Sequence, residues 1–270
     1  MNNRIGLTGS TGSLGKVILN NKKKLKIECF KGDITNYSEV ADWVKKKKLN
    51  ILIHLAAIVP IKTVNKNKKK AKLVNFIGTK NLVDACVDHN ISWFFFSSTS
   101  HVYKSSIKKI KEDSPKQPIS YYGKTKLMAE KYILKKFKNS KTNYCIGRIF
   151  STTNINQKKN YLVPDLKFKI KNCKKKITLK NLNHYRDFIS MDDLSNIIFK
   201  LMKIKFNGII NLATGNGVLL KEIANLIARK YNKTLLFKDN KKITYLIADI
   251  KLLSQFYLIK KSKKLKEMIF

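Results

Sequence analysis

Residues 4–15 read RIGLTGSTGSLG, in which an apolar run leads directly into a turn with three glycines. The run at residues 4–8 predicts a first β-strand, and residues 14–21 predict the helix that follows it. Gly9 and Gly12 permit a tight turn, and Gly15 permits close packing of the helix on the strand. The opening of the chain therefore predicts an α/β protein.

The same alternation continues through the first 150 residues. Strands are predicted at residues 25–30, 51–55, 91–97 and 143–149, and helices at 38–48, 71–89 and 121–138. Repeated strand–helix alternation indicates a parallel sheet with helices on both faces. The apolar strand ILIHL at residues 51–55 fits a sheet that is buried on both sides.

After residue 150 the pattern becomes less regular. A helix that Pro164 opens, a strand at 176–179, a helix at 191–203, a strand at 209–213 and a helix at 219–231 are predicted. The chain has no linker rich in Gly, Ser or Pro and no internal repeat. We therefore expect a domain at residues 1–150 and a smaller lobe at 151–270 that is packed on the first domain and partly returns to it.

The net charge of +40 comes from 57 basic residues, of which only four are arginines. Lysine runs without interleaved aromatic residues are typical of solvated surfaces, and the abundance of Lys, Asn, Ile, Phe and Tyr is typical of AT-rich coding sequence. Only the net charge argues for nucleic-acid binding, and no sequence motif supports it. We therefore expect no specific nucleic-acid partner. Where lysine is favoured, an arginine indicates a site that needs a planar, bidentate group, and Arg186 is the candidate.

The cysteines and the apolar runs exclude several classes. Cys29, Cys86, Cys145 and Cys173 are far apart in sequence, which predicts neither a disulfide framework nor a zinc site. No apolar run approaches the roughly 18 residues that a membrane span requires, and no signal peptide is visible. We expect no metal, no membrane partner and a cytoplasmic location.

Two later segments carry reactive side chains: SSTSHVY at residues 97–103 and YGKTK at residues 122–126. Tyr122 and Lys126 are four apart and share one helix face. A nearby ammonium favours the phenolate and lowers the tyrosine pKa from about 10 toward neutral pH. Thr99 could hydrogen-bond the same substrate oxygen. This set predicts proton transfer coupled to hydride transfer by a nicotinamide, whose pyrophosphate would lie on the glycine turn.

With these segments in place, the chain resembles the extended short-chain dehydrogenase/reductases that act on nucleotide sugars, the epimerase/dehydratase family. The matching segments cover nearly the whole chain: TGSTGSLG at 8–15, GDI at 32–34, HLAA at 54–57, VNFIGTKNL at 74–82, the two reactive segments, RIF at 148–150, NYLVP at 160–164 and YRDFISMDD at 185–193. The resemblance implies a Rossmann-type doubly wound parallel sheet with a smaller C-terminal substrate-binding lobe. It also implies an enzyme that binds NAD or NADP, with NAD slightly favoured, and a nucleotide-sugar substrate.

The resemblance assigns roles residue by residue. The implied cofactor-binding residues are Gly9, Thr11, Gly12, Ser13, Leu14, Gly15, Asp33, Ile34, Leu55, Ala56, Ala57, Asn75, Ser97, Tyr122 and Lys126. The implied catalytic residues are Thr99, Tyr122 and Lys126. The implied substrate-binding residues are Thr99, Ser100, Tyr122, Asn160 and Arg186. Asn75 is structural in the family and orders the active site, and His54 at a strand end is interpreted as structural.

Departures from the family pattern limit the prediction. The residue that reads the ribose 2′ position is missing or displaced, so NAD and NADP are not distinguished. Ser151 replaces an asparagine usual after RIF, which weakens one substrate contact. Ser100 and His101 stand where the family's 4,6-dehydratases carry two carboxylates, which disfavours dehydration and leaves the role of His101 open.

The expected activity is hydride transfer at a sugar carbon, with C4 as the expected position. A 4-epimerase is slightly favoured because residues 122–130 look more like that branch, and a 4-keto-6-deoxysugar reductase is the alternative. A non-catalytic dinucleotide sensor also remains open, although Thr99, Tyr122 and Lys126 argue against it. Whether the protein forms a homodimer is left open.

Overall fold

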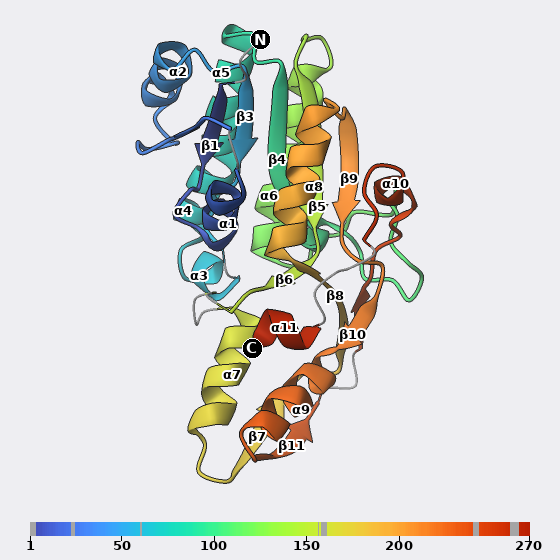
Figure 1. The fold of residues 1–270 in the computed structure, drawn as a ribbon. Coiled ribbons are helices and arrows are strands. Elements are labelled where there is room, and N and C mark those ends of the chain that lie inside the picture. The colour runs from blue at the N-terminus through green and yellow to red at the C-terminus, as the bar shows by residue number, and fades with distance from the viewer. Residues whose placement is uncertain are drawn as a thin grey trace. The chain divides into compact units, whose positions relative to one another are not determined.

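The computed structural model describes residues 4–22, 25–59, 61–155, 157, 161–239, 243–259 and 265–270 (Figure 1). The chain forms two compact units that interleave along the sequence. Unit 1 takes the described residues of Met1–Lys104, Pro115–Ile149 and Asp192–Ile210, and unit 2 takes those of Ser105–Ser114, Phe150–Met191 and Asn211–Phe270. The predicted domain boundary at residue 150 stays a prediction.

A six-stranded sheet forms the centre of unit 1. Its order is β2-β1-β3-β4-β5-β9, and the pairings of its first five strands are parallel. The strands are β1 Ile5–Thr8, β2 Ile27–Cys29, β3 Ile51–His54, β4 Trp93–Thr99, β5 Asn143–Ile149 and β9 Gly208–Leu212. Because the chain runs from β1 to β2 on one side and to β3 on the other, the strand order reverses at β1 and β3. In open α/β sheets, ligands bind beyond the carboxyl ends of the strands at such a reversal.

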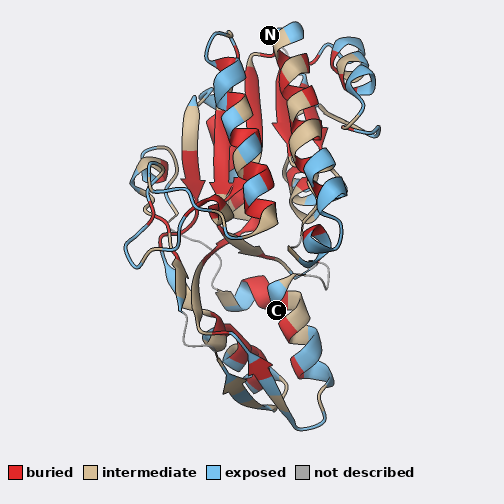
Figure 2. Cartoon of the chain, turned by 180° about the vertical axis from the view of Figure 1, so that it is seen from behind, coloured by how far each residue is buried: buried red, intermediate tan, exposed pale blue. Residues whose placement is uncertain are grey.

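Helices cover both faces of this sheet, as the sequence predicts (Figures 1 and 2). Leu52, Phe94 and Phe96 pack into one core with α2 (Tyr37–Lys46), α5 (Gly78–Asp88) and α6 (Tyr121–Phe137). The alternate strand residues point to the other face, where α1 (Ser13–Asn21) and α8 (Met191–Lys203) lie. All residues of β1 and β3 are buried, which confirms a sheet covered on both sides.

The helix predicted at residues 71–89 is present, but a π-helical turn interrupts it, which the prediction did not include. The structure has α3 (Ile61–Lys66), α4 (Lys68–Lys72), a π-helical turn η1 (Leu73–Ile77) and then α5. The wider turn places the buried side chain of Asn75 against the main chain of Ile58. A π-helical turn inside a helix often marks a functional site.

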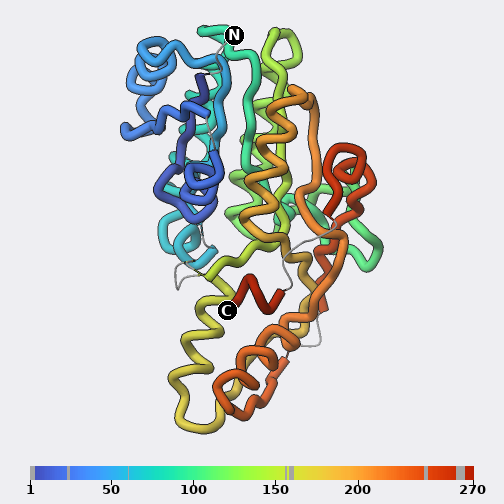
Figure 3. Tube along the Cα trace, in the orientation of Figure 1, coloured from blue at the N-terminus to red at the C-terminus, as the bar shows by residue number. Residues whose placement is uncertain are grey.

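Unit 2 is built from short strands and helices. The strands are β6 Ser151–Thr153, β7 Lys176–Lys180, β8 His184–Ser190, β10 Gly217–Leu219, β11 Thr234–Lys238 and β12 Thr244–Leu246, and the helices are α7 Leu162–Asn172, α9 Leu220–Lys230, α10 Lys251–Ser254 and α11 Leu265–Ile269. One sheet has the order β10-β8-β12, with β6 also paired to β8, and β7 pairs β11. Ile170, Ile223 and Met268 bring α7, α9 and α11 into one core. The colours of Figure 3 follow the chain from unit 2 back into unit 1 at α8.

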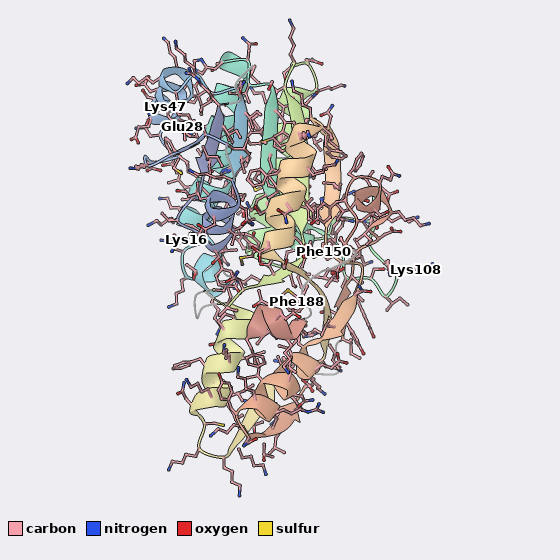
Figure 4. The ribbon with its side chains drawn as sticks, viewed as in Figure 1. Lys16, Glu28, Lys47, Lys108, Phe150 and Phe188 are labelled. Atoms are coloured by element: carbon pink, nitrogen blue, oxygen red, sulfur yellow. The ribbon has the colours of Figure 1, made fainter. Side chains whose placement is uncertain are left out.

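The excess charge lies on the surface of the units. Lys16, Lys47 and Lys108 are exposed, and Lys47 pairs with Glu28 at 3.4 Å (Figure 4). The three lysine runs at residues 45–48, 68–70 and 174–176 are exposed throughout, as the sequence predicts for solvated faces.

Candidate active site

The glycine turn after β1 packs directly on the end of β3. Gly9 has a φ of +74°, and a Cβ there would lie 2.6 Å from the backbone nitrogen of Ala56. A Cβ on Gly15 would lie 2.3 Å from the carbonyl oxygen of Gly9. Side chains at these two positions would separate the turn, the helix and the strand, so both positions require glycine.

The first turn of α1 is suited to an anion. Gly12 is its N-cap, and no side chain of the described residues caps the helix. Thr11 and Gly12 are exposed, while Ser13 and Leu14 are half-buried. The free N–H groups and the positive end of the helix dipole are the features that bind a phosphate group. The residues present therefore fit a dinucleotide pyrophosphate.

The other residues predicted to bind the cofactor follow the neighbouring strands. Asp33 and Ile34 lie in the turn after β2, where the side-chain amide of Asn81 donates to the Ile34 carbonyl at 3.1 Å. Asp33 is exposed, and a hydrogen bond from the Thr35 N–H lowers the pKa of its carboxyl. Half-buried residues continue from the end of β3 and lie on β4: Leu55, Ala56, Ala57 and Ser97. These residues lie at the carboxyl edge of the sheet, on either side of the strand reversal.

The predicted catalytic residues lie at the end of β4 and on the neighbouring helix α6. Thr99 closes this strand, and its Oγ1 accepts a hydrogen bond from the His101 N–H at 3.3 Å in the following turn, η2 (Ser100–Val102). The Tyr122 ring meets the His101 ring edge-on at a centroid distance of 6.2 Å. Thr99, Ser100 and Tyr122 are all largely buried. The structure therefore brings the turn after β4 and the start of α6 together.

Gly123 makes this close approach possible, and the sequence analysis did not single it out. A Cβ on Gly123 would lie 2.3 Å from the carbonyl oxygen of His101. Ser120 caps α6 by accepting a hydrogen bond from the Gly123 N–H at 3.0 Å. The small residue directly after Tyr122 was the available signal.

Lys126 lies one turn further along α6 and is fully buried. Its Nζ is 4.5 Å from the centroid of the Phe96 ring on β4. Burial lowers the pKa of Lys126 to about 7, while the negative charge of Glu130 acts in the opposite direction. Burial therefore disfavours the charged form of the ammonium that the sequence predicts at this position, and the Glu130 carboxylate favours it.

Behind Lys126 lies a buried ion pair that the sequence analysis did not predict. Arg148 donates to Glu130 through Nε at 3.0 Å and through Nη2 at 2.7 Å, in a bidentate arrangement. Ser98 also donates to Glu130, and Arg148 Nη1 donates to the Tyr103 hydroxyl at 2.8 Å. The pair ties α6 to β5. Its signal in the sequence is a glutamate four residues after Lys126.

Two predicted substrate residues belong to the second half of the chain. Asn160 lies outside the described residues. Arg186 lies on β8 in unit 2, where Nη1 donates to the carbonyl oxygens of Tyr185 and Thr244 at 2.7 and 3.2 Å. Its Nη2 donates to the Thr244 hydroxyl at 3.0 Å. Burial lowers the pKa of Arg186 to about 10.

Two further observations bear on the class of protein. Among the described residues, no group of three or more His, Cys, Asp or Glu side chains lies together in a way that could hold a metal ion. In the same part of the chain, no helix is both long and apolar enough to cross a bilayer.

A doubly wound parallel sheet with a glycine turn at its strand reversal is the architecture of dinucleotide-binding α/β proteins. The residues predicted to be catalytic, Thr99, Tyr122 and Lys126, lie at the end of β4 and on α6. Comparison with known proteins agrees, because the sequence model of the NAD dependent epimerase/dehydratase family matches residues 7–213. The chain belongs to this family. The predicted family, fold class and enzymatic nature are confirmed.

Individual relatives support the same placement. The chain is 31% identical to GDP-6-deoxy-D-talose 4-dehydrogenase of Aggregatibacter actinomycetemcomitans over 248 residues, which are 88% of this chain and 83% of the relative. It is 26% identical to UDP-glucose 4-epimerase of Lactobacillus helveticus over 73% of this chain and 66% of the relative. The solved structure of Thermus thermophilus UDP-glucose 4-epimerase with NAD has the same fold, with a TM-score of 0.86, 18% identity and coverage of 98% and 96% of the two chains.

Proposed function

We propose that the enzyme transfers a hydride between NAD(P) and C4 of a nucleotide-bound sugar. Tyr122 exchanges the proton of the C4 oxygen, and Thr99 hydrogen-bonds that oxygen and orients it. Lys126 lowers the tyrosine pKa in its charged form and holds the nicotinamide ribose. The observation that carries this proposal is the packing of η2, which directly follows Thr99, on the first turn of α6, which carries Tyr122.

The dinucleotide is assigned to the carboxyl edge of the sheet at β1 and β3. The uncapped first turn of α1 would hold the pyrophosphate, and the turn after β2 would hold the adenosine. When bound, the nicotinamide supplies or accepts the hydride. The family is described as NAD dependent, and the residues at the end of β2 do not distinguish NAD from NADP.

The position C4 is supported by the relatives. The two relatives above are named as a 4-dehydrogenase and a 4-epimerase, and both names specify chemistry at the same carbon. An epimerase oxidises and re-reduces C4 with one bound dinucleotide, whereas a dehydrogenase or reductase consumes it. The 4-dehydrogenase is the more similar of the two relatives in identity and coverage. A dehydrogenase or reductase activity therefore remains a candidate beside the epimerase activity.

A deuterium-transfer experiment tests the proposal. The purified protein is denatured and the released dinucleotide is identified, and fresh protein is then incubated with NAD or NADP and C4-deuterated UDP-glucose or GDP-6-deoxy-D-talose. Deuterium on the nicotinamide supports hydride transfer at C4. An inverted C4 centre without net cofactor change identifies an epimerase, and net reduction of the dinucleotide identifies a dehydrogenase. Tight dinucleotide binding with neither deuterium transfer nor inversion at C4 for either sugar would indicate a sensor instead.

The substrate role of Arg186 gives a separate prediction. We expect Arg186→Lys to weaken binding of the nucleotide sugar about 10- to 100-fold, because a lysine cannot reproduce a bidentate hydrogen bond to a phosphate. Loss of one charge-assisted hydrogen bond costs roughly 1.5–3 kcal/mol. NAD(P) affinity should stay unchanged. Isothermal titration with UDP-glucose and with NAD measures both.

Two matched variants separate this role from the structural contacts of Arg186. Arg229→Lys changes an exposed arginine on α9 and should have no effect. Thr244→Val removes the hydroxyl that Arg186 contacts within unit 2 and should lower stability while leaving sugar binding within a few-fold. Equal binding by the Arg186 and Arg229 variants would remove Arg186 from the site.

A further inference from the structure

His54 ends β3 and lies fully buried beside the glycine turn. Its Nδ1 lies 2.7 Å from Oγ1 of Thr8, the last residue of β1, and its Nε2 lies 2.9 Å from Oγ1 of Thr79 on α5. The ring also stacks on Phe96 of β4 at a centroid distance of 5.7 Å. One side chain therefore contacts two strands and a helix.

The partners of His54 fix the direction of its hydrogen bonds. The Thr79 hydroxyl donates to the carbonyl oxygen of Asn75 at 2.8 Å, so it must accept a hydrogen bond from His54 Nε2–H. A neutral ring then accepts at Nδ1, and it takes the hydroxyl proton of Thr8. The Thr8 oxygen in turn accepts a hydrogen bond from the Ala56 N–H at 3.3 Å. Every donor in this series has an acceptor when the ring is neutral and protonated on Nε2.

The surroundings of His54 support the neutral form. Burial lowers the pKa of the imidazole well below its ordinary value of 6.5, and the charge of Lys126 lowers it further. The aromatic rings of Phe94 and Phe96 cover the imidazole on the side of β4. A charged ring would donate from both nitrogens and would reverse the hydrogen bond with Thr8.

From Thr79 the contacts continue to the catalytic helix. The Asn75 amide accepts from the Ile58 N–H at 2.7 Å and donates to the Thr125 hydroxyl at 3.3 Å. Thr125 donates to the carbonyl oxygen of Tyr122 at 2.8 Å. Asn75 belongs to the π-helical turn η1, and its main-chain carbonyl oxygen accepts the hydrogen bond from the Thr79 hydroxyl. The series therefore begins at a residue assigned to the cofactor, Ala56, and ends on the main chain of Tyr122.

We propose that His54 is a positioning residue for Tyr122. In its neutral, Nε2-protonated form it fixes the Thr79 hydroxyl and the π-helical turn, so that Asn75 holds the first turn of α6 in place relative to the ends of β1 and β3. The inference rests on the proposed role of Tyr122 in proton transfer. His54 itself exchanges no proton with the substrate. A displacement of about 1 Å at a reacting group can cost about 10²-fold in rate.

Three variants test the series at different points. His54→Leu removes both polar atoms, and Thr79→Val removes the hydroxyl on α5 at nearly constant volume. We expect each to lower kcat about 10- to 100-fold, with NAD affinity within a few-fold. The pH at which kcat rises should move to higher values, because a displaced phenol loses part of the effect of the Lys126 charge. His54→Gln keeps a donor toward Thr79 and should recover most of the activity.

Assays with UDP-glucose and GDP-6-deoxy-D-talose measure kcat, and nitrogen-15 NMR of the imidazoles provides a readout without substrate. In the protein without added dinucleotide, the His54 signals should show the neutral, Nε2-protonated tautomer throughout about pH 5 to 8. Their absence in His54→Gln identifies them among the four histidines. A ring that is protonated on Nδ1, or that titrates near its ordinary pKa, would contradict the proposal.

A control and an independent variant keep the test decisive. Ser195→Ala removes a hydroxyl on α8 that is buried in the same unit and has no hydrogen-bond partner in the described part of the chain, and it should leave kcat unchanged. If His54→Leu does not fold, Thr79→Val decides. Loss of thermal stability with unchanged kcat and pH profile would assign His54 a purely structural role. Failure of the Tyr122 assignment would appear separately, as activity retained by Tyr122→Phe.

Discussion

Replacing Tyr122 with phenylalanine is expected to lower turnover about 10²- to 10⁴-fold, the range that general acid–base groups contribute. The change removes only the hydroxyl oxygen. The ring that meets His101 edge-on, and the main-chain carbonyl that Thr125 holds, both remain. The glycine turn and α1 are untouched, so NAD(P) affinity should stay within a few-fold. Stopped-flow measurement of nicotinamide reduction and titration with NAD separate the two quantities.

The adjacent tyrosine provides the matched control. Tyr121 also lies on the first turn of α6 but is only half-buried, and its ring contacts the Lys68 ammonium at 5.8 Å. Tyr121→Phe keeps that ring and should retain turnover close to that of the unmodified protein. If Tyr122→Phe kept most of its activity, or if both variants lost it equally, Tyr122 would not be the acid/base.

The features that were predictable from sequence depend on local signals. The apolar run before Gly9 and the glycines after it predict β1, the turn and α1, and the structure has all three in place. The boundaries of β5 and α8 are also as predicted. Buried strands in a parallel sheet are continuously apolar, so a run of only a few residues is enough to predict them.

Features that depend on distant partners were not predictable in the same way. The π-helical turn at Leu73–Ile77 arises because Asn75 bonds to Ile58, and its residues read as ordinary helix. His54 was interpreted only as structural, because Thr8 and Thr79 lie 46 and 25 residues away in sequence. In unit 2, β7 was predicted from the sequence and lies at Lys176–Lys180. Its partner β11 was not predicted, because its residues alternate between exposed and half-buried positions and give only a weak strand signal.

In a chain this rich in lysine, an arginine indicates a site that needs a bidentate group. The structure fits that argument most clearly at Arg148, for which the sequence analysis made no such prediction. Arg148 forms a bidentate ion pair with Glu130, and its side chain is 2% exposed. A lysine could not satisfy both carboxylate oxygens in this geometry. The sequence favoured Arg186 because of its place in a substrate segment, whereas burial, which distinguishes Arg148, becomes visible only in the fold.

This buried pair leads to the largest expected effect on stability. Arg148→Met should lower the free energy of unfolding by about 3–5 kcal/mol, because it leaves the Glu130 carboxylate buried without its main partner. Both tryptophans, Trp43 and Trp93, lie in unit 1 together with the pair. Urea unfolding followed by tryptophan fluorescence therefore reports on the unit that contains the change.

A double variant and a surface control show whether burial is the cause. Arg148→Met combined with Glu130→Gln removes both charges of the pair, so the two changes together should cost less than their sum by at least about 1 kcal/mol. Lys46 and Asp42 form an ion pair at 3.0 Å on the exposed face of α2, and Lys46→Met should change stability by less than about 1 kcal/mol. Additive costs for the buried pair, or a cost for Arg148→Met as small as that for Lys46→Met, would show that the Glu130 charge is not held by Arg148.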